Sequence, residues 1–256
     1  MSYNIWFDNP ENTENPWSER KNGIKETINQ LKPEIFCVQE ALDHQVKFLE
    51  FGEYKHFGVG RDDGKNAGEF SAILFDTIRF GFKNGGNFWL SETPDIAGSK
   101  GWDAECVRIA TWIHLLDSKT GKLFFVFNTH FDHMGETARL ESAGLIKQKI
   151  AEIAGDQPVI LTGDFNCQRG SDPYQVITDE DFSKPLSDTR YVSDNLSSEP
   201  DYSFVGSEFK GSKGNIIDHI FVSQDIKVFK ALIYENCQNG KCPSDHLPVV
   251  SEIIIE

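Results

Sequence analysis

The stretch Ile35-Phe36-Cys37-Val38-Gln39-Glu40 is a short apolar run that ends in a carboxylate. The same arrangement recurs where residues 124–129 lead into His130 and where residues 159–163 lead into Asp164. Apolar runs of this length predict buried strands. Polar residues that repeatedly end buried strands favour a site at one rim of a sheet. Two carboxylates and an imidazole gathered there suit a hard divalent cation held beside a phosphate ester.

The composition indicates a globular protein. The chain has 256 residues, of which 39% are hydrophobic and 25% are charged. It contains no evident linker or repeat, so we expect a single domain over residues 1–256. The formal net charge of −15 disfavours tight, nonspecific binding of polyanions. It leaves a phosphate-cleaving site open, because a bound cation inverts the local field.

The ends of the chain and its cysteines bear on its location. No apolar run is long enough for a transmembrane helix, and no signal peptide is present, so we expect no membrane insertion. Met1–Trp6 resembles the middle of a strand, so we expect upstream coding sequence such as a removed export signal. Cys237 and Cys242 flank a turn-like stretch, and a disulfide or two reduced thiols are both open. These features favour export over a cytoplasmic location.

Strands outnumber helices in the predicted secondary structure. Apolar spacing predicts helices at 18–31, 43–51, 135–154 and near 174–177. Strands are expected at 2–7, 35–39, 54–59, 71–75, 78–83, 87–90, 107–116, 123–130, 159–162, 216–222, 228–234 and 249–255. Runs of strands with few helices between them do not fit a regular βαβ alternation. They predict an α/β sandwich of two mixed sheets with outer helices.

Gly163-Asp164-Phe165-Asn166 is the first candidate for chemistry. Positions i and i+2 of an extended segment point the same way, so Asp164 and Asn166 would face one space. The carboxylate could orient or deprotonate a water, and the amide could donate to a phosphoryl oxygen. The alternative is an Asx-turn at a strand end, which needs no function.

Three further polar residues lie in or beside apolar strands. Asp218 lies within the apolar run 216–221 and needs a partner, for which we select His246 over a Lys or Arg. Asp245, beside that histidine, would bind a metal or shape the loop. Asn4, in the first strand, would support Glu40 at a metal or bond to a neighbouring strand end.

Arg108 and Arg61 are candidates for extra phosphate contacts. Arg108 lies in an otherwise apolar strand, and Arg61 lies in a charged, glycine-containing loop. A guanidinium group in such a place can clamp an anion through two parallel hydrogen bonds. A structural ion pair is the alternative, and we favour it for both residues.

In combination, these motifs resemble the endonuclease/exonuclease/phosphatase superfamily, in the order Asn4, Glu40, Asn128-Thr129-His130, Gly163–Asn166, Asp218-His219 and Ser244-Asp245-His246. The resemblance extends over residues 2–255. It implies a four-layer α/β sandwich, in which two mixed, mainly antiparallel sheets pack face to face with helices outside. It also implies a phosphoester hydrolase that depends on Mg²⁺ or Mn²⁺.

The resemblance also implies roles at the metal. Glu40 would be the main metal ligand, with Asn4 nearby. Asp245 would lie at the same metal or at a second metal position. In deoxyribonuclease-like members a glutamate orients the histidine that corresponds to His130, and Glu69 is in roughly the right place for that role.

The remaining roles concern the phosphate. By resemblance, Asp164 would orient the attacking water and Asn166 would hold the phosphate. His130 would contact the phosphate or protonate the leaving oxygen. Asp218 would orient His246.

The substrate class stays open between three hypotheses. Gly58–Gly64 and Phe88–Pro94 resemble an uncharacterised bacterial branch of the superfamily, and the signature of inositol 5-phosphatases is missing. The acidic composition favours small phosphoesters, such as sugar or inositol phosphates, over a nuclease acting on DNA or RNA ends. A binding module without activity is the third hypothesis, although all candidate catalytic positions are occupied. We expect a monomer.

Overall fold

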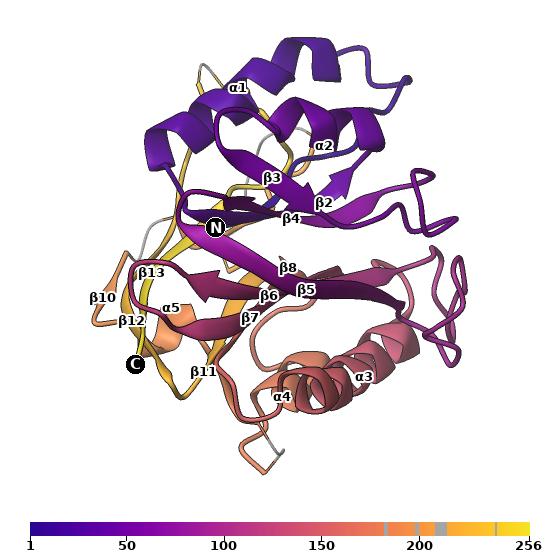
Figure 1. The fold of residues 1–256 in the computed structure, drawn as a ribbon. Helices are drawn as coiled ribbons and strands as arrows, with labels where there is room; N and C mark the ends of the chain where they lie inside the picture. The colour runs from indigo at the N-terminus through magenta and orange to yellow at the C-terminus, as the bar shows by residue number, and fades with distance from the viewer. Residues whose placement is uncertain (182–183, 198–199, 208–213, 239) are drawn as a thin grey trace.

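The computed structural model describes residues 1–181, 184–197, 200–207, 214–238 and 240–256. Its strands form two sheets that pack face to face, with helices on the outer faces (Figure 1). Helix, sheet, sheet and helix layers follow one another through the molecule. The fold is therefore the predicted α/β sandwich of two mixed, mainly antiparallel sheets.

The first sheet has seven strands in the order β10-β12-β13-β1-β2-β4-β3. They are β1 (Ser2–Asn4), β2 (Ile35–Ala41), β3 (Tyr54–Phe57), β4 (Phe70–Asp76), β10 (Asn195–Leu196), β12 (Ile226–Ile233) and β13 (Val249–Ile255). Strand β1 pairs parallel with β2, β10 pairs parallel with β12, and the other pairs are antiparallel. Because β1 lies inside the sheet, its buried polar residues need partners within the protein.

The second sheet has six strands in the order β5-β6-β7-β8-β11-β9. They are β5 (Phe80–Trp89), β6 (Ile109–Asp117), β7 (Leu123–His130), β8 (Val159–Asp164), β9 (Leu186–Asp188) and β11 (Asp218–Ser223). Only β7 and β8 run parallel among these neighbours. The register sets His130 opposite Asp164, and Asp164 opposite Asp218. Three ionisable groups therefore stand side by side at one end of this sheet.

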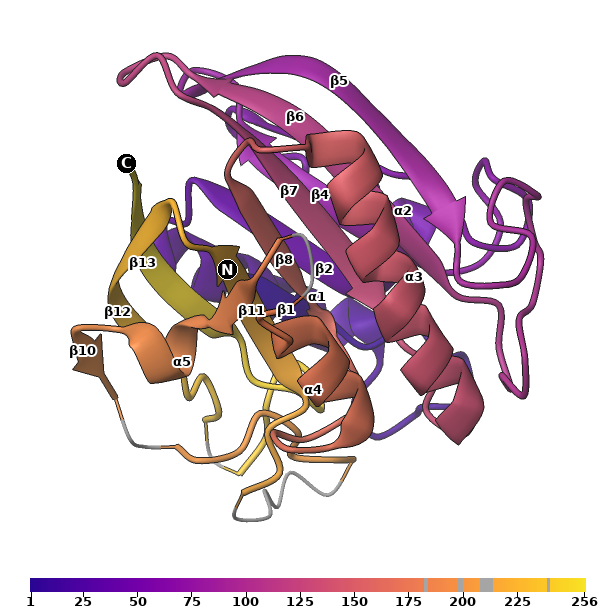
Figure 2. The same cartoon turned by 90° about the horizontal axis from the view of Figure 1, so that it is seen from below.

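The helices flank the sheets. Helices α1 (Trp17–Leu31) and α2 (Asp43–Leu49) lie over the first sheet, and α3 (Glu136–Ala154) and α4 (Asp172–Thr178) lie over the second (Figures 1 and 2). A short α5 (Thr189–Val192) contacts β12. Among the described residues, no helix combines the length and the apolarity that crossing a membrane requires.

Strand β7 shows how the two cores divide. Its successive side chains point to opposite faces of the sheet. Phe124 and Val126 pack into the core between the sheets, whereas Phe125 and Phe127 pack into the core beneath α3. All four are at most 5% exposed, and each buried side chain stabilises the fold by roughly 1.5–3 kcal/mol. A strand buried on both faces reads as a continuous apolar run, as β7 does.

Several strands differ from the sequence prediction in their bounds, and β9 and β10 were not predicted. The expected strands 78–83 and 87–90 are one strand, β5, with an irregularity between Phe82 and Asn84. Gly85 resembles a turn residue in the sequence, yet a Cβ there would lie 2.8 Å from the Phe57 ring, so the glycine serves close packing. The first strand ends at Asn4 instead of continuing to Phe7.

The structure also joins Cys237 and Cys242 in a disulfide.

Candidate active site at the strand ends

Polar side chains from both sheets meet at one end of the sandwich. Asn4 ends β1, Glu40 lies near the end of β2, and His130 and Asp164 end β7 and β8. Asp218 begins the antiparallel strand β11, so it reaches the same end. The strand topology alone thus gathers residues that are far apart in the sequence.

The amide of Asn4 joins the two sheets at this end. Its Nδ2 atom donates to Glu40 Oε1 at 3.0 Å and to Asp164 Oδ2 at 2.9 Å. The same nitrogen lies 3.4 Å from His246 Nε2. Its Oδ1 atom accepts the backbone N–H of Trp6, so the whole amide is held. Three side chains that the sequence analysis expects to converge therefore surround a single amide nitrogen.

Asp164 and Asn166 reach the site through a turn. Asn166 has a left-handed φ of 47°, and its backbone N–H donates to Asp164 Oδ1 at 3.0 Å. The Asx-turn considered as an alternative is therefore present, and it does not remove Asn166 from the site. Asn166 Nδ2 lies 3.1 Å from His130 Nε2, which in turn lies 3.4 Å from Asp164 Oδ2. The common direction of the two side chains comes from the turn instead of an extended backbone.

Asp218 forms the expected pair with His246. Its Oδ2 atom lies 2.8 Å from His246 Nδ1, and the two side chains are 0% and 5% exposed. No lysine or arginine takes this place among the described residues. The other ring nitrogen, Nε2, lies 3.6 Å from Asp164 Oδ2. The imidazole thus lies between two buried carboxylates.

The two site histidines have opposite charge tendencies. Burial alone would lower the pKa of His246, but the carboxylates of Asp218 and Asp164 outweigh burial and raise its pKa well above the ordinary value. Burial, with the charges of Arg108 and Arg61, lowers the pKa of His130 well below that value. These directions favour the cationic form of His246 and the neutral form of His130. Burial raises the pKa of Asp164 to about 7, and the charge of Asp218 adds to the rise.

Glu40 is held in an unusual backbone conformation. Its φ of 62° lies in the left-handed region, where a non-glycine residue is uncommon. The β2–β4 register shifts between Val38 and Ala41, so Glu40 lies in a bulge. Bulges re-aim side chains and cluster at functional sites. Here the bulge places Glu40 Oε2 where it accepts the backbone N–H of Phe7 at 3.2 Å.

The donor set fits a divalent cation. Glu40, His130 and Asp164 each offer one ligand atom, and these atoms lie within 4.8 Å of one another. Carboxylate oxygens are ligands that Mg²⁺ and Mn²⁺ prefer. Asp245 lies near this donor set: burial raises its pKa to about 6, and the charge of Glu40 adds to the rise. Asn4 points its amide nitrogen at Glu40, and its amide oxygen accepts the N–H of Trp6. In this orientation Asn4 positions the Glu40 carboxylate and does not itself offer an oxygen to the cation.

The predicted contact between Glu69 and His130 is not made. Glu69 Oε2 instead accepts Arg61 Nη1 at 2.6 Å. His130 Nδ1 has no hydrogen-bond partner among the described residues. Burial, with the charge of Glu40, raises the pKa of Glu69 to about 7. The sequence correctly predicted that Glu69 lies near His130. It did not predict that Glu69 pairs with Arg61, eight positions earlier, because the path of the intervening loop was not predictable.

Arg61 and Arg108 show features of both predicted roles, the structural ion pair and the phosphate contact. Arg61 pairs with Glu69, and Arg108 Nε lies 3.4 Å from Asp132 Oδ2, so both form ion pairs. Yet both arginines line one small cavity, whose remaining lining residues are Glu40, Glu69, Phe70, Ser71, Ile109 and His130. Arg61 Nε and Arg108 Nη1 have no hydrogen-bond partner among the described residues, although Arg61 Nε lies 3.8 Å from Asp62 Oδ1. Buried donors without acceptors are costly, but this cavity has no room for a water molecule in the structure, so an anion would reach them only after lining side chains move.

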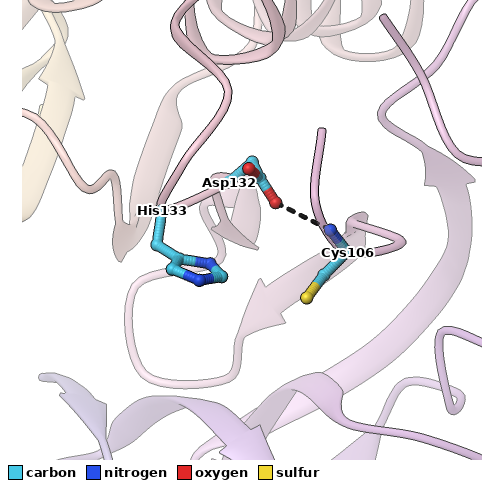
Figure 3. Close-up of side chains that lie close together, drawn as sticks. All are labelled: Cys106, Asp132 and His133. Atoms are coloured by element: carbon cyan, nitrogen blue, oxygen red, sulfur yellow. Dashed lines mark hydrogen bonds between the residues drawn. The ribbon is translucent and has the colours of Figure 1, made fainter. Parts of the chain in front are cut away.

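A second group of potential ligands lies nearby, comprising Cys106, Asp132 and His133 (Figure 3). Figure 3 shows Asp132 turned toward the backbone of Cys106, to which it is bonded at 3.0 Å. The oxygens of Asp132 accept four backbone N–H groups, from Glu105, Cys106, Met134 and Gly135. His133 Nδ1 faces Arg108 Nη2 at 3.0 Å. Because the Asp132 oxygens and His133 Nδ1 already have partners, we assign no metal to this group.

Sequence reasoning missed the serines that hold the site loops. Ser244 Oγ donates to the Asn4 carbonyl at 2.7 Å and lies 3.3 Å from the His246 N–H. Ser203 Oγ accepts the N–H groups of Ile217 and Asp218. Ser244 adjoins the Asp-His pair in the sequence, which was a usable signal. Nothing in the sequence pointed to Ser203, because it is 15 residues from its partner Asp218.

Comparisons with known proteins agree with this geometry. Residues 1–246 match the Endonuclease/Exonuclease/phosphatase family. An endonuclease/exonuclease/phosphatase from Bacteroides vulgatus is 38% identical, with a TM-score of 0.92, over 100% of this chain and 97% of that protein. The mannosyl-6-phosphatase of Bacteroides thetaiotaomicron is 36% identical, with a TM-score of 0.91, over 99% of this chain and 98% of that protein.

Curated relatives match a shorter part. An uncharacterised protein of Acanthamoeba polyphaga mimivirus is 31% identical over 171 residues, which are 63% of this chain and 62% of that protein. The chain spans less than two thirds of the length of the curated relatives it matches. The family match, in contrast, extends from residue 1 to residue 246 and includes all the site residues described above. The chain belongs to the endonuclease/exonuclease/phosphatase family.

Proposed function

We propose that this protein is a divalent-metal-dependent hydrolase of small phosphate esters. The observation that carries the proposal is the meeting of Glu40, Asp164 and the Asp218–His246 pair around the Asn4 amide. Phosphoryl transfer requires positioning and charge neutralisation more than covalent chemistry. Carboxylates for a cation, a carboxylate for a water and N–H donors for a phosphate meet those needs within one buried cluster.

Glu40 is the proposed principal ligand of the cation, which we take to be Mg²⁺ or Mn²⁺. When bound, the cation would neutralise charge on the phosphate and fix its orientation. Asn4 holds the Glu40 carboxylate at 3.0 Å, so its proposed role is to position that ligand. Asp245 lies close enough for its pKa to respond to Glu40, so it would serve the same cation or a second one.

Asp164 is the proposed partner of the attacking water. Its Oδ2 atom faces Asn4, His130 and His246, at the centre of the cluster. The carboxylate would accept a proton from the water as the water oxygen attacks phosphorus. The bond between phosphorus and the ester oxygen would then break, and the ester oxygen would leave with the proton of His246 Nε2. The proton taken up by Asp164, whose Oδ2 lies 3.6 Å from that nitrogen, would return to the ring.

Hydrogen-bond donors would hold the phosphate. Since Asp218 occupies His246 Nδ1, the Nε2–H of that ring is the donor directed at the substrate. Asn166 would hold the phosphate only by exchanging a contact, because its Nδ2 already faces His130 Nε2 at 3.1 Å and donates to the Phe131 carbonyl at 3.0 Å. Donors aimed at the oxygens where negative charge develops are the usual means of stabilising such a transition state. Arg108 and Arg61 would contribute further contacts from the adjoining cavity.

Small substrates fit better than nucleic acid. The formal net charge of −15 repels polyanions over a long range. A protein of the same fold, 36% identical over 99% of this chain, is a mannosyl-6-phosphatase. These two facts support a sugar phosphate or a similar phosphorylated metabolite as the substrate class.

A substrate panel with defined cations tests the proposal. Hexose 6-phosphates, inositol phosphates, bis(p-nitrophenyl) phosphate and short oligonucleotides would be assayed with Mg²⁺, with Mn²⁺ and with EDTA. We expect cation-dependent release of phosphate, or of nitrophenol, from the small esters. Cleavage confined to oligonucleotides would make the protein a nuclease. Cation binding without any turnover on the panel would support a binding module instead.

A further inference from the structure

Arg20 is buried in the first half of α1, yet no described residue forms an ion pair with it. It is 4% exposed, and no described carboxylate lies within 4.0 Å of its guanidinium group. The group donates instead to backbone carbonyl oxygens. Nη1 bonds to the carbonyl of Ile5 and, at 3.4 Å, to that of Pro243, while Nη2 bonds to the carbonyls of Trp6 and, at 2.9 Å, Phe7.

The peptides that Arg20 holds carry their N–H groups to the proposed metal site. The N–H of Trp6 donates to Asn4 Oδ1 at 3.1 Å, and the N–H of Phe7 donates to Glu40 Oε2 at 3.2 Å. Arg20 thus fixes the carbonyl side of two residues whose N–H groups orient Asn4 and Glu40. Trp6 alone links the guanidinium group to Asn4 in this series of hydrogen bonds, and Phe7 alone links it to Glu40.

The fourth carbonyl connects Arg20 to the loop that carries His246. Pro243 precedes Ser244, whose hydroxyl bonds to the Asn4 carbonyl at 2.7 Å and lies 3.3 Å from the His246 N–H. Helix α1 also packs directly on this loop, since a Cβ at Gly23 would lie 2.8 Å from Pro243. One guanidinium group therefore holds both chain segments that flank the site on the side of the first sheet.

The place of Arg20 is fixed by its surroundings. The centroids of the Trp6 and Trp17 rings lie 5.4 Å and 5.1 Å from its central carbon, and cation–π attraction to both rings helps to hold the group. Trp6 has a φ of 57°, a conformation that a bulky residue adopts only when its surroundings impose it. The carbonyl bonds from Arg20 supply that constraint, because they span the turn in which Trp6 lies.

We infer that Arg20 is a positioning residue for the proposed metal site. It holds the turn after β1 and the loop before His246 in the one arrangement that presents Glu40 to a cation. This inference rests on the proposed function for its kinetic consequences, but its effect on cation binding is independent of turnover. The arrangement uses the two terminal nitrogens of the planar group, while Nε has no hydrogen-bond partner among the described residues, so a lysine replaces the guanidinium group only in part.

Calorimetry and kinetics on the whole chain test the inference. Arg20→Gln should raise the Kd for Mn²⁺ about 10- to 100-fold and lower kcat by a similar factor, as is typical when a group that supports a metal ligand is lost. Arg20→Lys should give a smaller rise, and it serves as the second variant if the glutamine protein does not fold. Arg79→Gln is the matched control, because Arg79 is also mostly buried and pairs with Asp117 at 2.7 Å in another part of the fold.

The outcomes separate the inference from the proposed function. A folded Arg20→Gln protein with the wild-type Kd and kcat overturns the inference while the hydrolase stands. Equal losses in Arg20→Gln and Arg79→Gln, matched to equal losses of Tm, also overturn it, since they indicate a general effect on stability. A wild-type protein that binds Mn²⁺ but hydrolyses no ester, with weakened binding in Arg20→Gln, supports the inference and removes the hydrolase. No Mn²⁺ binding to the wild-type protein removes both.

Discussion

Asp218 Oδ2 lies 2.8 Å from His246 Nδ1, in a pair almost completely shielded from solvent. The carboxylate fixes which ring nitrogen faces it and stabilises the protonated ring. The same strand that carries Asp218 pairs with β8 in a register that sets Asp218 opposite Asp164. The pairing of two strands therefore delivers both the residue that orients the histidine and the carboxylate that the histidine faces.

Breaking this pair should impair turnover more than stability explains. We expect Asp218→Asn to lower kcat about 10- to 100-fold with little change in KM, because the amide no longer stabilises the cationic ring. Steady-state kinetics and thermal melts would measure the two effects. Asp188→Asn is the matched control, since Asp188 Oδ2 bonds His219 Nδ1 at 2.9 Å in another buried pair of the same sheet. An equal fall of kcat in both variants would argue against the special role of Asp218.

The proposed base is tested directly by Asp164→Ala and His246→Ala. Each should reduce kcat at least ~10²-fold while circular dichroism stays close to that of the wild type. The double variant should lose little more than the worse single variant, because the two side chains act on one transition state. Near-normal turnover of either single variant would refute the assignment, whatever the substrate.

Chelation and a change at Glu40 test the cation. EDTA should abolish turnover, and added Mg²⁺ or Mn²⁺ should restore it. Glu40→Gln should raise the cation concentration for half-maximal rate at least ~10-fold, because a neutral amide is a poorer ligand than a carboxylate. Glu34→Gln is the control, since Glu34 pairs with Arg79 and is not among the potential ligand groups. Full activity in EDTA would contradict the metal-dependent mechanism.

Apolar runs predicted much of the fold, because few structures other than a strand buried on both faces accommodate a short, continuous apolar run. Strand β7 was predicted to the residue, and α1 to within one residue. Strand β5 was split in two because Lys83-Asn84-Gly85-Gly86 has the composition of a turn, while the glycines in fact admit Phe57 and Trp112. Local composition cannot reveal a partner that approaches from a distant segment.

The residues of the site also fall into two groups, those that the sequence reveals and those that it does not. Residues that end strands, such as Glu40 and Asp164, were identifiable because a polar group at the end of an apolar run is visible in the sequence. Arg20 was not, because an arginine on a helix resembles an ordinary exposed residue until the turn after β1 folds against it. The Glu69–Arg61 contact likewise depends on a loop path that no periodicity encodes. Sequence thus located the reacting groups better than the groups that hold them.

Arg108 should contribute to substrate binding more than to chemistry. Its Nη1 atom has no partner among the described residues and belongs to the cavity beside His130. We expect Arg108→Met to raise KM for a phosphate monoester about tenfold, the effect of losing one charge-assisted hydrogen bond. Arg79→Met is the control, because its cation is in an ion pair away from this cavity. An unchanged KM in the folded Arg108 variant would leave only the structural ion pair with Asp132.

Asp132 should make the protein sensitive to acid. Burial opposes its ionisation, but backbone N–H donors, that of Gly135 first among them, outweigh burial and lower the pKa of Asp132 well below its ordinary value. A carboxylate whose folded pKa is depressed stabilises the fold above its unfolded pKa of about 3.9 and loses that contribution as pH falls toward the folded pKa. Asp132→Asn should therefore reduce the free energy of unfolding by about 2 kcal/mol at pH 7. As pH falls below about 5, through the unfolded pKa of about 3.9, the variant should lose less stability than the wild type in urea melts. Parallel pH profiles for the two proteins would show that Asp132 does not hold its neighbouring loop through its charge.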